Sequence, residues 1–202
     1  MKIRNFIWCG LALLSLVACK EEDDTVEEFV NWQATNDQYF SNLVEETQER
    51  VVAGDKSWSL IPAYTKPNTG YALDYCDYVV AEKLEEGDGK TSPLLSDSVE
   101  VHYEGRLLPS LNYPLGYVFD KSYTGTFDPV VASPAKFLLQ GVVVGFSSVL
   151  MRMHRGDHWR VYIPYQLGYN NSSTSSVIPA YSTLIFDLRL EDFWRKTQGD
   201  RE

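Results

Sequence analysis

The sequence predicts an α+β domain in which a short helix lies against an antiparallel sheet. Several short strands are separated by turns, and within 141–164 the apolar period changes from helical to strand-like. Four apolar residues recur at helical spacing: Phe146, Val149, Leu150 and Met153. Gly156 is suited to end this helix in a left-handed conformation. From His158 onward every second residue is apolar, as in a half-buried strand.

Composition and charge narrow the class of protein. A chain of 202 residues can hold one domain and a smaller appendage. Its 44% hydrophobic content predicts a folded core rather than disorder. The net charge of −10 becomes −12 once residues 1–18 are removed, because they carry Lys2 and Arg4. Since no cluster of Lys and Arg is present, we expect no nucleic-acid partner.

Residues 1–18 have the pattern of a signal peptide. Lys2 and Arg4 precede an apolar run, Phe6 to Val17, that is too short to span a bilayer. The run ends in Leu-Val-Ala followed by Cys19, which resembles a bacterial lipoprotein signal. That resemblance implies lipidation of Cys19 and membrane attachment in the envelope of a Gram-negative bacterium, at the periplasmic face or the cell surface of its outer membrane. An ordinary secretory signal that contains a cysteine is the alternative.

Residues 19–24 continue with Lys-Glu-Glu-Asp-Asp after Cys19. This acidic tether resembles the signals that send some lipoproteins to the cell surface, although a solvated spacer fits equally well. With Cys9 removed in the signal and Cys19 lipidated, Cys76 has no disulfide partner. We expect Cys76 to be a small buried hydrophobic residue rather than a nucleophile.

Residues 25–54 predict an amphipathic helix. Thr25 and Glu28 have the spacing of a capping box. Apolar side chains then recur at helical intervals: Phe29, Trp32, Tyr39, Phe40, Leu43 and Val44. This stripe must pack on its own domain, on a second copy in a homodimer, or on a client chain. We expect the helix to be a separable spacer or pairing element.

The rest of the chain reads as a linker at 55–74, a domain at 75–193 and a polar tail at 194–202. The linker contains one possible edge strand at 58–61. Further strands are predicted at 75–83, 98–108, 116–122, 134–139, 158–163 and 184–190. In the strand at 98–108, the face that carries Glu100, His102 and Glu104 has the pattern of a solvent face. His102 lacks ligand partners at metal-binding spacing, so we expect no metal site.

Nine short motifs in this domain resemble, in order and spacing, the FKBP-type peptidyl-prolyl cis-trans isomerases. They are Val101-His-Tyr-Glu-Gly105, Gly116-x-x-Phe119-Asp120-x-Ser122, Pro134-x-x-Phe137-x-Leu139, Val143-x-Gly145-Phe146, Met153-x-x-Gly156, Val161-x-Ile163-Pro164, Leu167-x-Tyr169, Ile178-Pro179 and Leu184-x-Phe186-Asp187. A single motif of this kind is weak, but nine in sequence are specific. The resemblance implies a curved antiparallel sheet that wraps a short helix.

The same resemblance implies an isomerase that assists the folding of exported or envelope proteins and takes proline-containing polypeptides as clients. Rotation about an X-Pro bond breaks no bond, so it requires no nucleophile, metal, cofactor or proton relay. One alternative is a catalytically weak, proline-binding chaperone or interaction module. Another is a scaffold in a lipoprotein that is accessory to nutrient uptake.

Carried over position by position, the resemblance implies an aromatic proline pocket. The expected catalytic residues are Tyr103, Phe119, Asp120, Tyr169 and Phe186. The expected substrate-binding residues are Phe137, Val142, Val143, Phe146 and Ile178. The Tyr169 hydroxyl is a candidate donor to a substrate carbonyl. Asp120 is either a polar anchor at the pocket edge or a structural carboxylate that holds a nearby Tyr or Arg.

Three positions depart from the family pattern. Phe146 replaces the usual Trp of the pocket floor and therefore lacks an N–H donor. Ala135 stands where a larger apolar side chain is common, and Tyr169 is followed by Asn170 and Asn171 rather than Gly. We expect these changes to affect substrate preference more than basal isomerisation.

Overall fold

The computed structural model describes residues 27–66, 72–173 and 177–195. The expected signal peptide, Cys19 and the acidic tether lie outside the described residues, as does most of the polar tail. Among the residues that are described, no helix combines the length and apolar character needed to cross a membrane.

The described residues form a seven-stranded sheet in the order β1-β2-β6-β7-β3-β4, with β5 also paired to β3. All of these pairs are antiparallel. The strands are β1 Trp58–Pro62, β2 Tyr78–Glu85, β3 Ser98–Arg106, β4 Val118–Lys121, β5 Ala135–Leu138, β6 His158–Ile163 and β7 Leu184–Trp194. β1 is the edge strand foreseen within the linker, and β7 continues four residues beyond its predicted end. The predicted α+β class is confirmed.

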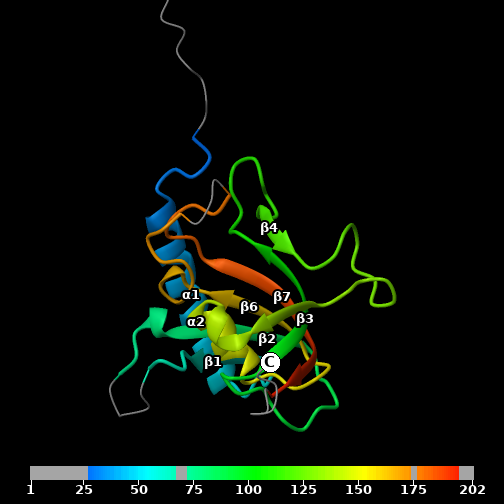
Figure 1. Cartoon of the computed structure of the whole chain (residues 1–202). Coiled ribbons are helices and arrows are strands. Elements are labelled where there is room, and N and C mark those ends of the chain that lie inside the picture. Colours follow the sequence, from blue (N-terminus) through cyan, green and yellow to red (C-terminus); the bar gives the residue numbers. More distant parts are fainter. Residues whose placement is uncertain (1–26, 67–71, 174–176, 196–202) are drawn as a thin grey trace, which may run out of the picture.

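The short helix α2, Val144–Leu150, lies in the hollow of the curved sheet (Figure 1). Val149 and Leu150 are fully buried in the main core. Gly145 lets the helix approach β6 closely, because a Cβ atom there would lie 2.3 Å from Cγ2 of Ile163. The helix ends at Leu150, earlier than predicted, and a turn carries the chain to Gly156, which has a φ of 87°. Short 3-10 helices flank the core at Tyr75–Asp77, Leu139–Gly141 and Tyr165–Leu167.

The N-terminal helix α1 covers Trp32–Val52 and starts later than the predicted capping box at Thr25. Thr25 lies outside the described residues, and the N-cap is Asn31 in a left-handed conformation with a φ of 51°. The Glu28 carboxylate is used elsewhere, since it accepts a hydrogen bond of 2.9 Å from the backbone N–H of Asn112. Glu28 therefore makes a long-range contact just before the helix.

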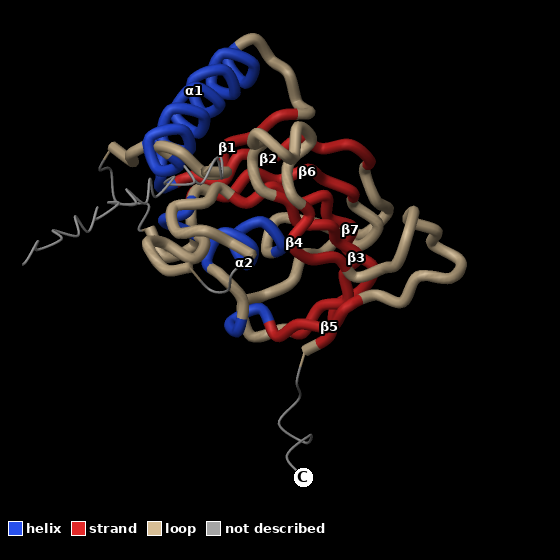
Figure 2. The backbone as a smooth tube through the Cα atoms, turned by 90° about the horizontal axis from the view of Figure 1, so that it is seen from above, coloured by secondary structure: helices blue, strands red, loops and turns tan. Residues whose placement is uncertain are grey.

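The helix α1 makes buried contacts with the rest of the chain, which argue against its being a separable element. The Trp32 indole N–H donates to the Ser182 hydroxyl at 2.8 Å, and the backbone N–H of Thr183 donates to the Asn36 side chain at 2.7 Å. Asn36 is fully buried and Phe40 is 1% exposed. Figure 2 shows α1 and α2 on opposite sides of the sheet, near β1. Of the three alternatives for its apolar side, packing on its own domain is the one the structure has.

The outer face of β3 is not the solvent face that its pattern predicted. His102 is only 4% exposed because the Phe127 ring, from the segment between β4 and β5, packs edge-on over it at 5.0 Å. The Arg189 guanidinium also lies over the Phe127 ring, 5.2 Å from its centroid. Alternation alone cannot foresee this cover, since it comes from a loop distant in sequence.

Candidate active site

An apolar pocket of about 200 Å³ opens between α2 and the strands of the curved sheet. It is lined by Tyr103, Phe119, Asp120, Phe137, Gly141, Val142, Val143, Phe146, Tyr169 and Phe186. These residues come from β3, β4, β5, β7, α2 and the segments that flank α2 and follow β6. The pocket exists only when all of these elements are packed together.

Phe146, at the start of α2, forms the centre of the aromatic lining. Its ring centroid lies 5.1 Å from that of Phe186, 6.1 Å from that of Phe137 and 6.3 Å from that of Tyr103. All three pairs are edge-to-face, the arrangement that the ring quadrupoles favour. Each ring therefore packs against its neighbours in the pocket wall.

Gly105 in β3 is required for this arrangement. A Cβ atom at this position would lie 2.6 Å from ring atoms of both Phe119 and Phe186. The two rings are themselves edge-to-face, with centroids 5.6 Å apart. The glycine of the first motif thus leaves the space that the pocket wall fills.

The polar side of the pocket is a pair formed by Tyr103 and Asp120. The Tyr103 hydroxyl donates to the Asp120 carboxylate at 2.6 Å. Burial raises the pKa of the Tyr103 hydroxyl above its usual value, and the hydrogen bond to Asp120 raises it further. Burial also raises the pKa of Tyr169. Both hydroxyls therefore stay protonated at neutral pH and can donate hydrogen bonds.

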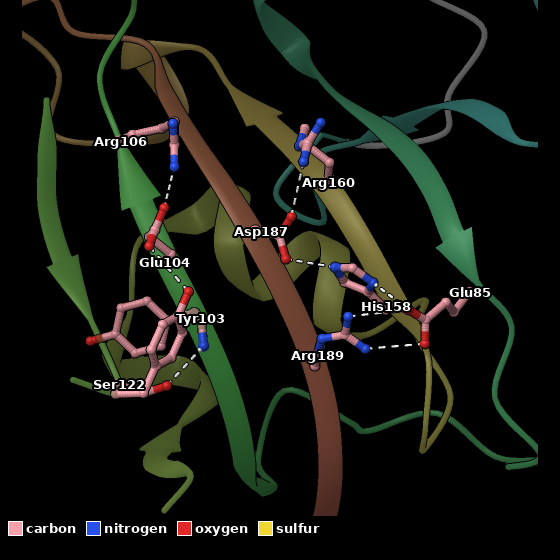
Figure 3. A network of polar contacts seen from close by, with 10 residues as sticks. Glu85, Tyr103, Glu104, Arg106, Ser122, His158, Arg160, Asp187 and Arg189 are labelled. Atoms are coloured by element: carbon pink, nitrogen blue, oxygen red, sulfur yellow. Dashed lines mark hydrogen bonds and ion pairs between the residues drawn. The ribbon is translucent and has the colours of Figure 1, made fainter. Parts of the chain in front are cut away.

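Ser122 forms two hydrogen bonds with the backbone of Tyr103. The backbone N–H of Tyr103 donates to the Ser122 hydroxyl at 3.0 Å, and the Ser122 backbone N–H donates to the Tyr103 carbonyl at 3.0 Å. Figure 3 shows Ser122 beside Tyr103. The Phe-Asp-x-Ser motif thus supplies a wall residue, a partner for the Tyr103 hydroxyl and a partner for its backbone.

The pocket contains nine of the ten residues that the sequence pointed to, and Ile178 is the exception. Ile178 is 7% exposed and packs in the main core, which also contains the pocket residues Tyr103, Phe146 and Phe186. Gly141, which the sequence did not single out, lines the pocket because the 3-10 turn before α2 brings its backbone to the rim.

The described residues give little support to metal binding or thiol chemistry. Within the described part of the chain, no three or more His, Cys, Asp or Glu side chains are grouped so as to hold a metal ion. Burial raises the pKa of the Cys76 thiol, and the negative charges of Asp74 and Asp77 raise it further. Cys76 is therefore a poor source of a thiolate.

A second polar cluster, which the sequence did not predict, lies on the outer face of β6 and β7 (Figure 3). His158 stands between two carboxylates, with Nε2 2.6 Å from Asp187 and Nδ1 3.1 Å from Glu85. Arg160 bonds Asp187 at 3.1 Å, and Arg189 bonds both oxygens of Glu85 at 3.1 Å. Burial alone would raise the pKa of Asp187, but the bonds from His158 and Arg160 lower it below its usual value. The cluster joins β2, β6 and β7 on the side of the sheet away from the pocket.

Comparison with known proteins agrees with this geometry. Residues 89–191 match the family model of the FKBP-type peptidyl-prolyl cis-trans isomerases. The macrophage infectivity potentiator of Trypanosoma cruzi is 33% identical over 139 residues, which cover 61% of this chain and 65% of that protein. The peptidyl-prolyl cis-trans isomerase Mip of Coxiella burnetii is 39% identical over 107 residues, which cover 53% of this chain and 41% of Mip.

The crystal structure of FkpA from Escherichia coli is similar in fold. It superposes with a TM-score of 0.50 and 27% identity, covering 81% of this chain and 64% of that one. The match to the two curated relatives spans less than two thirds of the length of each. Since the family model covers half of the sequence and its motifs surround one pocket, the chain belongs to the FKBP-type peptidyl-prolyl cis-trans isomerase family.

Proposed function

We propose that the protein is a peptidyl-prolyl cis-trans isomerase that binds X-Pro segments of polypeptide clients in the pocket around Phe146. The observation that carries the proposal is the pocket itself, an open apolar cavity of about 200 Å³ with a single carboxylate at its edge. Its volume and aromatic lining suit a proline ring, and the family membership of the chain supports the same activity.

The chemistry follows from the properties of the amide. Isomerisation must cross a barrier of about 18–20 kcal/mol because the twisted amide loses its resonance. The planar ground state is more polar than the twisted state, so water stabilises it preferentially. A pocket of aromatic rings removes that water and thereby favours the twisted state over the ground state. No proton has to move and no bond has to break.

The two polar groups have separate roles in this proposal. The Tyr169 hydroxyl donates to a substrate carbonyl and orients the peptide across the pocket. Asp120 holds the Tyr103 hydroxyl through the 2.6 Å bond, so its first role is to fix that ring in the wall. This combines the two expectations for Asp120, since the carboxylate lines the pocket and is at the same time the partner of a tyrosine.

A proline-binding chaperone without turnover is the competing function. A filled or collapsed pocket would favour it, whereas this pocket is open and its rings pack edge-to-face. Nothing in the described residues favours a scaffold for nutrient uptake over either alternative. The geometry is therefore best suited to catalysis of isomerisation.

The decisive experiment measures exchange between the cis and trans forms of a short X-Pro peptide by NMR. The full chain carrying Cys19→Ser should accelerate this exchange, and the peptide should shift the ring resonances of Phe119 and Tyr169. Circular dichroism shows whether the protein is folded. Peptide-induced shifts without acceleration, in folded protein, would leave the proline-binding chaperone as the better account.

We also propose that the protein is an envelope lipoprotein attached to the membrane through Cys19, where it assists the folding of exported proteins. The short apolar run and the Leu-Val-Ala-Cys sequence support the anchor. Two or more acyl chains give stable attachment where one does not. Membrane fractionation of cells should recover the wild type in the membrane pellet and the Cys19→Ser variant in the soluble fraction. Sedimentation of that variant with membranes would contradict the anchor.

Trp32 and Phe40 of α1 pack on their own domain, whereas Tyr39, Leu43 and Val44 are only half-buried. We propose a monomer as the working unit, with a homodimer through α1 as the alternative. Sedimentation velocity of the soluble Cys19→Ser variant would decide this directly.

A further inference from the structure

The loop that joins β3 to β4 is uncharged and exposes apolar side chains. Residues 107–117 contain no charged side chain, although the whole protein has a net charge of −10. Leu107 and Leu108 are buried in the core at its base. Leu111 and Leu115 are 65% and 79% exposed, and Tyr113 is 41% exposed. Exposed apolar side chains are normally scattered singly over a protein surface. Three of them on one uncharged loop therefore require an explanation.

Hydrogen bonds hold the backbone of this loop in a defined turn. Five hydrogen bonds close it. Leu107 N–H donates to the Tyr117 carbonyl at 2.9 Å, Gly116 N–H to the Tyr113 carbonyl at 2.8 Å, and Arg106 Nη1 to the Leu115 carbonyl at 2.9 Å. Ser110 and Tyr113 also exchange backbone hydrogen bonds at 3.1 and 3.2 Å. Gly116 has a φ of 81°, and a Cβ atom there would lie 2.1 Å from the Leu107 carbonyl oxygen. The backbone thus fixes the two leucines on the outside.

The same loop lies beside the point where the described chain begins. In Figure 1 both are at the upper end of the molecule. The Glu28 carboxylate accepts hydrogen bonds from the backbone and the side chain of Asn112, at the middle of the loop. Val30, close to this contact in sequence, is also 56% exposed. The loop and the N-terminal segment therefore form one end of the protein.

The proposed anchor places this end near the bilayer. Cys19 precedes Glu28 by nine residues, a length that spans at most about 32 Å when fully extended. A lipid on Cys19 therefore keeps Glu28, and with it the loop, within this distance of the membrane surface. Val130 and Val131 are also exposed, but among the described residues the hydrogen bonds of Glu28 join the N-terminal segment to the loop at 107–117.

We propose that the loop at 109–116 is a membrane-contact surface that inserts Leu111 and Leu115 into the interface of the bilayer beside the lipid anchor. This inference rests on the proposed lipidation of Cys19. It adds an orientation, because one end of the domain would face the membrane while the protein remains attached.

The chemistry of the loop indicates which lipid surface it suits. Leucine side chains gain free energy from the acyl boundary, and tyrosine is favoured at the level of the headgroups. The loop has no Lys or Arg to attract anionic lipids, while Glu27, Glu28 and the acidic tether would be repelled by them. The expected partner is therefore a zwitterionic phospholipid surface.

The test places an environment-sensitive fluorophore at the loop of the full-length, lipidated protein. Cys76→Ser removes the competing thiol, and Leu115→Cys receives the label. Leu94→Cys is the matched control: Leu94 is also exposed, at 48%, but precedes the other end of β3. Eight residue steps of strand separate the two ends of β3 by about 27 Å. The proteins are bound to phosphatidylcholine vesicles whose acyl chains carry a nitroxide quencher.

The label at position 115 should be quenched several times more strongly than the label at position 94, with a blue shift of its emission. Equal quenching at both positions, while the protein remains on the vesicles, would overturn the membrane-contact surface and leave the anchor intact. A blue shift without vesicles that grows with protein concentration would assign the loop to a second copy and also overturn the proposal. Failure of the labelled protein to bind vesicles at all would refute the anchor instead.

Discussion

Within the pocket, the rings and the carboxylate contribute in different ways. Phe119 is a half-buried wall residue that excludes water from the bound proline, whereas Asp120 acts on the pocket through its bond to the Tyr103 hydroxyl. If catalysis depends on desolvation, removing a ring should cost more than removing the carboxylate. This difference leads to a comparison of two single substitutions.

Phe119→Ala should lower kcat/KM for a short X-Pro peptide more than Asp120→Ala does. A loss of about 1–3 kcal/mol of transition-state stabilisation corresponds to a reduction of roughly fivefold to 160-fold, since each 1.36 kcal/mol is a factor of ten. NMR exchange rates at a fixed protein concentration provide the measurement. The reverse order of the two variants would indicate that the carboxylate, not the aromatic wall, carries the catalysis.

Phe127→Ala is the matched control for this comparison. It also removes a half-buried aromatic ring, but from the outer face of β3, where the ring covers His102. Its activity should stay near that of the wild type. Denaturant unfolding of each variant separates a lost ring contact from a lost fold, because deleting a buried ring can cost about 3–5 kcal/mol.

The Asp187 carboxylate should make the stability of the protein depend on pH. Because its pKa is lowered in the folded protein, it contributes stability above its unfolded pKa, about 3.9, and that contribution is lost as the pH falls through the folded pKa. Asp187→Asn should therefore be clearly less stable than the wild type near pH 6, and the difference should shrink below about pH 4. Urea unfolding at both pH values provides the measurement. An equal stability difference at both pH values would contradict this role of the Asp187 carboxylate.

At the scale of elements, α1 depends on one buried amide. Asn36 accepts from the Thr183 backbone at 2.7 Å and donates to the Trp32 carbonyl at 2.7 Å. Asn36→Ala would leave the buried N–H of Thr183 without its partner, at a cost of about 1–3 kcal/mol. The free energy of unfolding from a urea titration should fall by that amount. Gln38→Ala, an exposed change on the same helix, should have little effect, and equal losses in both variants would contradict this role of Asn36.

The elements were predictable where their pattern is local. The alternation in β3, β6 and β7 and the helical spacing of Phe146, Val149 and Leu150 depend on neighbours in the sequence. The start of α1 was not predictable in this way, because Glu28 bonds to Asn112 rather than to its own helix. The burial of His102 likewise depends on Phe127, which lies 25 positions away in the printed sequence.

At the scale of the whole molecule, the pocket was also only partly predictable from local sequence patterns. Alternation places Tyr103 and Phe186 on the inner face of the sheet, but only the family resemblance relates them to Phe137 and Tyr169 on other segments. Ile178 lies in the same core cluster as Tyr103 and Phe186 but is not among the residues that line the pocket. The outer cluster of Glu85, His158 and Asp187 spans three strands and leaves no mark in any single stretch of sequence.

The last prediction concerns whether the domain folds without α1. The family motifs are complete without this helix, but the sheet is not. Val79 and Val80 are both fully buried although adjacent strand residues face opposite sides, so β2 is covered on both faces. Losing α1 would expose Phe40 and its contacts, about 1.5–3 kcal/mol, and leave the Thr183 N–H unpaired, about 1–3 kcal/mol. Typical domains are stable by only about 5–15 kcal/mol.

Deletion of residues 1–56 should therefore lower the urea midpoint sharply or abolish cooperative unfolding, and with it turnover of a short X-Pro peptide. Deletion of residues 1–24 is the control, since it removes only the predicted signal and tether and should leave both measurements unchanged. A protein that lacks residues 1–56 but keeps its urea midpoint and its turnover would show that α1 is a separable appendage after all. The contacts of Trp32 and Asn36 with the segment before β7 argue for the first outcome, because they join the helix to the strand that carries Phe186.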